Sequence, residues 1–129
     1  MLDLKGRNPH LSELVLAELR NDRPVTVCAR SWPLLEPFAG REGVRVVHSV
    51  GSRRELGRLL CRFGDRRLDG VSVHERLLDA STAAQLRRLA AVVMSWPVNT
   101  VQRARELTSL GVEGLITDNL ALAGALESS

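Results

Sequence analysis

The 129-residue sequence is poor in aromatic residues: it holds two tryptophans, two phenylalanines and no tyrosine. Proteins that bind single-stranded nucleic acids stack the bases on aromatic side chains, and this chain has little from which to build such a surface. Its net charge is +3, but the arginines are spread along the sequence, as they are on solvated helix faces. We therefore expect no nucleic-acid partner.

The sequence also contains no long apolar run, no recognisable signal pattern and no cysteine cluster. No stretch of apolar residues is long enough to cross a bilayer. The opening residues MLDLKGR lack the basic start and the apolar run of a secretory signal, which favours a cytoplasmic location. Cys28 and Cys61 have no metal-like spacing, and we interpret both as reduced core thiols. The length fits a single domain over residues 1–129.

What the sequence does contain is a repeating pattern of short β-branched runs, each followed by a segment with helical periodicity. The runs begin roughly twenty to twenty-five residues apart, the length of one strand-helix unit with short loops. Such alternation predicts parallel strands and an α/β fold. About six units are present, whereas a (β/α)8 barrel has eight, so the predicted fold is a partial TIM-barrel-like one. The predicted strands are 2–5, 25–28, 44–48, 70–74, 92–96 and 114–117.

The predicted helices have recognisable starts. Ser52 followed by Glu55 forms a capping-box pattern, and Thr82 followed by Gln85 forms another. Asn99 can cap the helix that follows it. These patterns predict helices that begin near residues 53, 83 and 100.

The carboxyl ends of parallel strands gather on one edge of the sheet, where α/β proteins bind ligands. Lys5 stands at such an end and is the only lysine, since seventeen of the eighteen basic residues are arginine. Side chains alternate along a strand, so Asp3 and Lys5 share the side opposite Leu2 and Leu4. If the leucines face the helices, the charged pair faces the inside of the barrel.

Four stretches resemble one enzyme family in their order and spacing. LDLKG (2–6) stands where the family has Glu-Ile-Lys or Glu-Leu-Lys, and VTVCARSW (25–32) where it has an apolar strand ending in Ser-Ser-Phe. VMSWPVNT (93–100) is similar to its Trp-Thr-Val-Asn, and LTSLGVEGLITDNLALA (107–123) to a helix followed by Gly-Val-Asp-Gly-Ile-Ile-Thr-Asp. The family is that of the glycerophosphodiester phosphodiesterases, TIM-barrel hydrolases of lipid and glycerol metabolism. With a divalent metal, they convert glycerophosphodiesters to glycerol 3-phosphate and an alcohol.

Position by position, the resemblance implies three site residues. Lys5 takes the place of the family lysine that faces the phosphate, where an ammonium stabilises charge developing on the phosphoryl oxygens. Trp96 takes the place of a tryptophan that lines the pocket against the glycerol or the leaving group. Asp3 takes the place of the third metal-binding carboxylate. Asn99 and Asp118 match residues that position loops.

Other family motifs are absent from the sequence: His-Arg-Gly, Glu-x-Asp and the His-Asp pair. They carry the acid and base histidines and two of the three metal ligands, and they belong to the first two strands of the family barrel. The resemblance implies a divalent metal, Mg2+ or Ca2+. Asp3 is shorter than the family's glutamate, and a lone carboxylate rarely holds such an ion, which argues against metal binding by this chain alone. We expect the isolated chain to be inactive or impaired.

Plainer interpretations of the same residues stay open. Asp3 and Lys5 can be an exposed pair near a chain end, which contributes little to stability, and Trp96 can be an ordinary core residue. His10, His48 and His74 fall in segments that reach the ligand edge, but nothing in their spacing requires that two of them replace the missing acid and base.

A six-unit barrel has two unpaired strand edges, at the first and the last strand. The sheet can associate with a second copy, be completed by a separate chain, or close into a smaller structure. We favour a homo-oligomer or a complementing chain. The expected ligand is a glycerophosphodiester or another phosphate-bearing small molecule. The alternative function is a non-catalytic remnant of the fold that binds a phosphate ligand or a protein.

Overall fold

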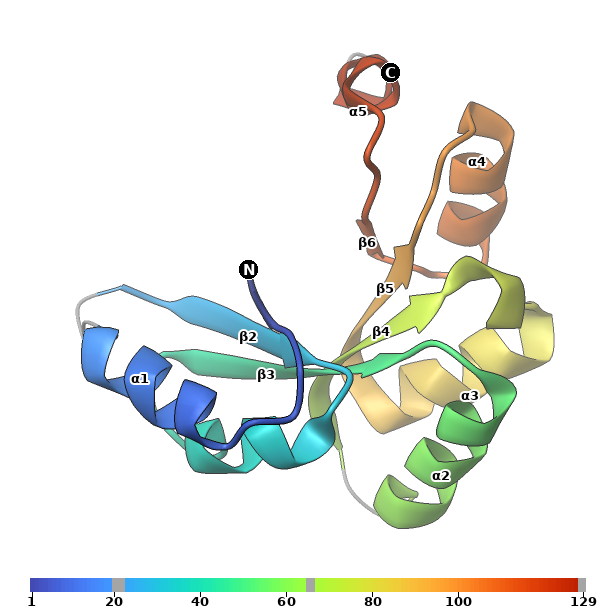
Figure 1. Ribbon diagram of the computed structural model, residues 1–129. Coiled ribbons are helices and arrows are strands. Elements are labelled where there is room, and N and C mark those ends of the chain that lie inside the picture. The colour runs from blue at the N-terminus through green and yellow to red at the C-terminus, as the bar shows by residue number, and fades with distance from the viewer. Residues whose placement is uncertain (20–22, 65–66, 128–129) are drawn as a thin grey trace.

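The computed structural model describes residues 1–19, 23–64 and 67–127. In this part of the chain, six parallel strands form one sheet in the order of the sequence. The sheet bends so that its last strands stand upright against the first ones, which gives it the shape of an incomplete barrel (Figure 1). The α/β class and the partial barrel predicted from the sequence are confirmed. The strands are β1 (Leu2–Leu4), β2 (Val25–Ala29), β3 (Val44–Val50), β4 (Leu68–His74), β5 (Ala90–Trp96) and β6 (Gly114–Leu115).

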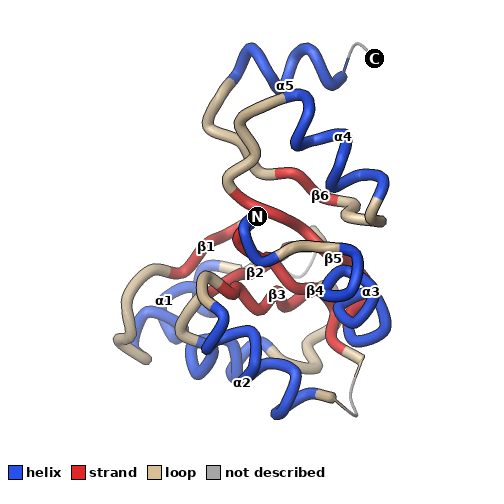
Figure 2. Tube along the Cα trace, turned by 90° about the vertical axis from the view of Figure 1, so that its right-hand side faces the viewer, coloured by secondary structure: helices blue, strands red, loops and turns tan. Residues whose placement is uncertain are grey.

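Helices follow the strands and lie on the outer, convex side of the sheet. Figure 1 shows α1 below β2 and β3, and α2 and α3 below and to the right of β4, and Figure 2 shows α4 and α5 grouped at the end of the sheet that holds β6. In the described part of the chain, no helix covers the concave side. No helix there is long and apolar enough to span a membrane. The helices are α1 (His10–Glu18), α2 (Arg53–Phe63), α3 (Ala80–Leu89), α4 (Val101–Ser109) and α5 (Leu120–Glu127), with 3-10 helices η1 (Trp32–Phe38) and η2 (Glu75–Leu77).

Strand alternation divides the sheet residues between the two sides. Leu4, Val27 and Val71 belong to the core cluster that packs under the helices. The alternate residues point to the concave side, because neighbouring side chains on a strand point in opposite directions. Asp3 lies opposite Cys28 in the parallel register, so both face the concave side. Leu4 therefore meets the helices, as the condition set in the sequence analysis requires, whereas Leu2 near the chain end is exposed.

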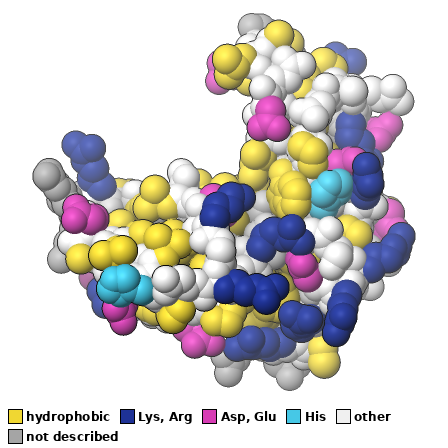
Figure 3. Space-filling model, viewed as in Figure 1, with side chains coloured by type: hydrophobic (Ala, Val, Ile, Leu, Met, Phe, Trp, Pro, Cys, Tyr) yellow, Lys and Arg dark blue, Asp and Glu magenta, His cyan; other side chains and the backbone are white. Residues whose placement is uncertain are grey.

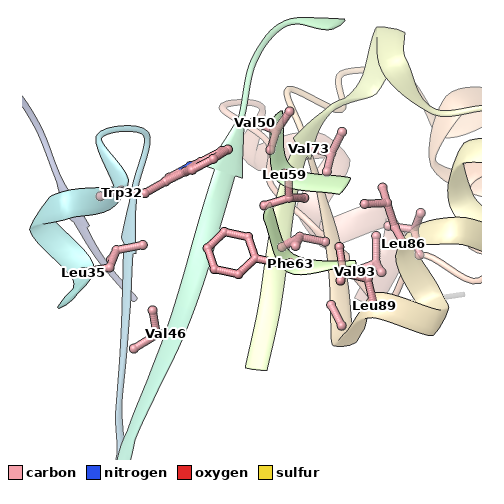
Figure 4. Packing of buried hydrophobic residues seen from close by; sticks show 14 of the residues in the cluster. Trp32, Leu35, Val46, Val50, Leu59, Phe63, Val73, Leu86, Leu89 and Val93 are labelled. Carbon is pink, nitrogen blue, oxygen red and sulfur yellow. The ribbon is translucent and has the colours of Figure 1, made fainter. Parts of the chain in front are cut away.

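The core between sheet and helices is made of aliphatic side chains and three aromatic residues, Trp32, Phe38 and Phe63. Leu59 of α2 and Leu86 of α3 are fully buried and point toward the sheet, where Figure 4 shows Val50, Val73 and Val93 beside them. Burying one such side chain contributes about 1.5–3 kcal/mol. This packing fixes α2 and α3 against the sheet and so fixes the loops that precede them.

One of the three predicted helix starts is confirmed. The hydroxyl of Ser52 accepts a hydrogen bond from the Glu55 N–H at 3.2 Å, as a capping residue does. The start at Thr82 is wrong, because α3 begins at Ala80 and its cap is Asp79, whose carboxylate accepts the Thr82 N–H at 2.8 Å.

The start at Asn99 is also wrong. Thr100 caps α4 and its hydroxyl accepts the Arg103 N–H at 3.1 Å. Threonine takes this place because its backbone is extended while the next residue is already helical. The amide of Asn99 instead accepts a hydrogen bond from the Thr117 hydroxyl at 3.3 Å, which links the loops after β5 and β6. The side chain of Asn99 therefore connects two loops and does not cap α4.

Candidate functional site

A row of side chains follows the carboxyl ends of the strands on the concave side. His74 and Trp96 are opposite each other at the ends of β4 and β5. Leu4 and Ala29 are opposite each other at the ends of β1 and β2, so Lys5 and Arg30 come next on adjacent strands. Figure 3 shows lysine and arginine side chains gathered near the middle of this face. The row therefore combines two cations with two aromatic rings at the edge where α/β proteins bind ligands.

Lys5 follows the last residue of β1 directly. Its Nζ lies 2.7 Å from Oδ2 of Asp3, and the two side chains are 81% and 43% exposed. An exposed pair of this kind contributes about 0–1 kcal/mol to folding. The ammonium has three N–H donors, and only one is needed by Asp3. The remaining donors can reach an anion at the strand ends.

Arg30 is the second cation of the row, and the sequence analysis assigned it no role. Its Nη2 donates to Oε1 of Glu55 at 2.8 Å. The other oxygen of that carboxylate accepts the Gly51 N–H at 2.7 Å. A methyl group at Gly51 would lie 2.5 Å from Nη2 of Arg30, closer than real side chains approach. Because Gly51 has no side chain, the guanidinium of Arg30 can occupy the space beside it.

Trp96 packs against His74 at the opposite end of the row. Their ring centroids are 4.9 Å apart and the rings are inclined by 76°. Nδ1 of His74 accepts the Arg76 N–H at 3.2 Å, which fixes the imidazole. The indole Nε1 of Trp96 is buried and has no hydrogen-bond partner among the described residues. A buried donor without a partner is costly.

Asp3, the residue suggested as a metal ligand, stands alone. The described residues contain no group of three or more histidine, cysteine, aspartate or glutamate side chains that could hold a metal ion. The carboxylate of Asp3 is paired with Lys5, and its neighbour across the strand register is Cys28. The described residues therefore do not fit the divalent metal that the resemblance implies.

The two cysteines are free thiols. Burial raises the pKa of the Cys28 thiol to about 11, and the carboxylate of Asp3 adds to this effect. The thiol is therefore neutral and unreactive near neutral pH. Cys61 lies on α2 and is exposed, so the prediction that both thiols lie in the core is wrong for Cys61.

Only one of the three histidines lies in the row of strand-end residues. His48 is on the helix side of β3, where its ring centroid lies 4.8 Å from that of Phe63 and 5.8 Å from that of Trp32. His10 is exposed at the start of α1, and its Nδ1 lies 3.1 Å from a carboxylate oxygen of Glu13. The structure thus brings His74 alone to the candidate site, and no second histidine joins it there.

A cavity of about 370 Å3 adjoins His48 on the helix side of the sheet. It lies between η1 and α2, and Arg62 and Glu36 approach each other to 3.6 Å beside it. Two prolines keep η1 short: Pro33 stands near its start and Pro37 lies inside it, where a ring disrupts an α-helix. The cavity is on the opposite side of the sheet from Lys5 and Trp96.

Comparison with solved structures identifies the fold. A protein of Silicibacter pomeroyi assigned as a glycerophosphoryl diester phosphodiesterase matches 98% of this chain with a TM-score of 0.76 and 18% sequence identity. A phosphodiesterase of Oleispira antarctica, in complex with the product sn-glycerol 3-phosphate, matches 92% with a TM-score of 0.66 and 14% identity. The glycerophosphodiester phosphodiesterase of Thermotoga maritima matches 96% with a TM-score of 0.65 and 18% identity.

The chain spans about half the length of these structures, with coverage of 48%, 49% and 55% of the three. No protein-family model matches the sequence, and no curated protein matches it. The chain therefore has the fold of about half of a glycerophosphodiester phosphodiesterase barrel.

Proposed function

We propose that this chain is a glycerophosphodiester phosphodiesterase-type half-barrel that binds a phosphate ester of glycerol at the carboxyl ends of its strands, and that hydrolysis by the isolated chain is absent or severely impaired. One observation carries the proposal: Lys5 follows the end of β1 and Trp96 ends β5 on the concave side of a sheet whose fold matches these phosphodiesterases. A neighbour of the same fold is in complex with sn-glycerol 3-phosphate.

In this proposal the two ends of the row have different tasks. The exposed ammonium of Lys5 donates hydrogen bonds to phosphoryl oxygens, and it stabilises their negative charge. The ring of Trp96 provides an apolar wall for the glycerol carbons.

Impaired hydrolysis follows from the groups that can move a proton. Phosphodiester cleavage needs a base to activate the nucleophile and an acid to protonate the leaving alcohol. The sequence contains no His-Arg-Gly, Glu-x-Asp or His-Asp motif. Among the described residues only His74 stands in the row, and its Nδ1 is already occupied by the Arg76 N–H. One imidazole cannot hold both roles at the same moment.

The sheet edges support association with a second copy or with a complementing chain. In the described part of the chain, β1 pairs only with β2 and β6 pairs only with β5. Large apolar side chains are exposed near both edges: Met1 and Leu2 at one, and Leu120, which is 87% exposed, at the other. An unpaired parallel edge beside exposed apolar surface favours pairing with another chain. Light scattering over a range of concentrations tests this, and a monomer at all concentrations contradicts it.

A hydrolysis assay tests the enzymatic part of the proposal. The purified chain is incubated with glycerophosphocholine and Mg2+ or Ca2+, and release of glycerol 3-phosphate is measured. We expect no turnover above the buffer control. Turnover that the Lys5→Ala variant loses would contradict the proposed impairment. Binding of sn-glycerol 3-phosphate to the wild-type chain, lost in Lys5→Ala, is the positive result that the proposal requires.

A further inference from the structure

We propose that Arg30 is a second phosphate-binding residue, and that Arg30 and Lys5 together select phosphate monoesters over phosphodiesters without a metal. This inference rests on the proposed function, because it concerns the same row of strand-end residues. The resemblance assigned no role to Arg30, and its family has serine in this part of the strand end. The inference depends on where the guanidinium lies, what holds it and which of its donors are free.

Arg30 follows β2, the strand that pairs with the strand before Lys5. Leu4 and Ala29 are register partners on β1 and β2, and Lys5 and Arg30 follow them. Neighbouring strands lie about 4.8 Å apart. The guanidinium of Arg30 lies over Gly51 at the end of β3, so the exposed Lys5 side chain has to extend toward it for one phosphate group to contact both cations. Cys28 faces the concave side together with Asp3, so Arg30, two residues further on, starts toward the same side. The two cations are thus neighbours on one face of the sheet.

The Arg30 guanidinium is held in a fixed place. Glu55 accepts from Nη2 of Arg30 through one oxygen and from the Gly51 N–H through the other. The carboxylate is therefore oriented by the backbone as well as by the arginine. Gly51 leaves open the space over the end of β3 that the guanidinium fills. A held guanidinium loses less conformational entropy when it binds a ligand.

The Arg30 guanidinium has N–H groups that no protein group among the described residues uses. A guanidinium has five N–H groups in a planar fork. Glu55 is its only hydrogen-bond partner among the described residues, and the Arg30 side chain is 53% exposed. At least one pair of parallel N–H groups therefore remains for a ligand. Such a pair matches two oxygens of a phosphate group.

The oxygen count of the ligand then decides the selectivity. A phosphate monoester has three terminal oxygens, so the arginine fork can take two while the ammonium of Lys5 takes the third. A diester has only two terminal oxygens, and the fork and the ammonium must share them. The geometry therefore favours a monoester of a small polyol, such as sn-glycerol 3-phosphate, over glycerophosphocholine.

Titration calorimetry in the presence of EDTA tests the inference with these two ligands. We expect wild-type protein to bind sn-glycerol 3-phosphate at least about tenfold more tightly than glycerophosphocholine, the equivalent of one charge-assisted hydrogen bond. Arg30→Gln weakens monoester binding about tenfold to a hundredfold and removes most of the selectivity. Arg30→Lys keeps the charge but loses the fork, so we expect selectivity to fall in this variant as well. Arg58→Gln, an equal change of charge at an exposed position of α2, leaves both affinities unchanged.

The outcomes separate this inference from the proposed function. If Arg30→Gln binds the monoester as the wild type does while Lys5→Ala does not, the role of Arg30 is refuted and the proposed function stands. Equal affinity of the wild type for both ligands refutes the selectivity. A wild-type chain that binds neither ligand refutes the proposed function and this inference together. Thermal melting of each variant, expected within about 2 °C of the wild type, shows that a loss of binding is not a loss of fold.

Discussion

His48 makes the stability of this fold depend on pH. Its ring lies between Phe63 and Trp32 on the helix side of the sheet, and its Nδ1 is buried without a partner among the described residues. Burial, and to a smaller extent the positive charge of Arg62, lower the pKa of His48 to about 4, although Asp69 opposes the shift. The neutral imidazole is therefore the form that the folded chain accepts.

The direction of the effect follows from proton binding. Between pH 6.5 and 4 the unfolded chain protonates His48 and the folded chain does not. The free energy of unfolding is therefore highest above pH 6.5 and falls as the pH is lowered. The fall attributable to His48 is at most about 1.4 kcal/mol per pH unit, or ~3 kcal/mol by pH 4. Because the ring is partly exposed, the observed value will be smaller, yet it is a large part of the ~5–15 kcal/mol that stabilises a typical domain.

Urea denaturation of the wild type and of His48→Leu, measured from pH 7.5 to pH 4, tests this reasoning. At pH 7.5 we expect the two free energies of unfolding to agree within about 1 kcal/mol, because no hydrogen bond of His48 is lost. At pH 4 the variant should be more stable by roughly 1–3 kcal/mol. His10→Gln, which changes an exposed histidine, should follow the wild type at every pH. Parallel pH profiles for the wild type and His48→Leu would refute the account.

Three further substitutions test the packing, the caps and a side-chain network. Leu59→Ala, at a fully buried position, should lower the free energy of unfolding by about 2–5 kcal/mol. Leu14 is exposed, and Leu14→Ala should change this free energy by no more than about 0.5 kcal/mol. Equal losses for the two variants in urea denaturation would contradict this packing. Ser52→Ala removes the cap of α2 and should cost about 1 kcal/mol, with faster hydrogen exchange confined to the first turn of α2 if the cap is local. Arg103 donates to the Glu75 carboxylate at 2.8 Å and to the Glu75 carbonyl at 2.6 Å. Arg103→Met should therefore lower the free energy of unfolding by roughly 1–3 kcal/mol. Unchanged thermal melting would show that these hydrogen bonds do not stabilise the loop at Glu75.

The architecture could be predicted from the sequence because its signals are local. Regularly spaced runs, rich in β-branched residues everywhere except at LDLK (2–5), identify the six strands, and parallel order follows from the alternation with helices. The helix starts were less certain because several capping residues compete within a few positions. Asp79 precedes Thr82, and Thr100 follows Asn99. The residue that caps the helix is the one whose backbone is extended. Which of two candidate residues is extended depends on where the preceding strand or loop ends.

The candidate site was predictable in part for the same reason. Lys5 and Trp96 stand at strand ends, which the pattern locates, and the pairing of His74 with Trp96 follows from the register of β4 and β5. The pattern also locates Arg30 at a strand end, but the place of its guanidinium depends on a long-range contact with Glu55 and on the space left by Gly51. No periodicity encodes a contact between residues 25 positions apart.

The central claim is that the strand ends on the concave side form a phosphate site. Amide NMR spectra of the labelled chain, recorded during titration with sn-glycerol 3-phosphate, test it most directly. We predict that the largest shift changes occur at residues 5, 30, 51 and 96, and that Lys5→Ala abolishes them. Spectra that do not change at millimolar ligand, or changes confined to the cavity beside His48 on the other side of the sheet, would contradict the claim.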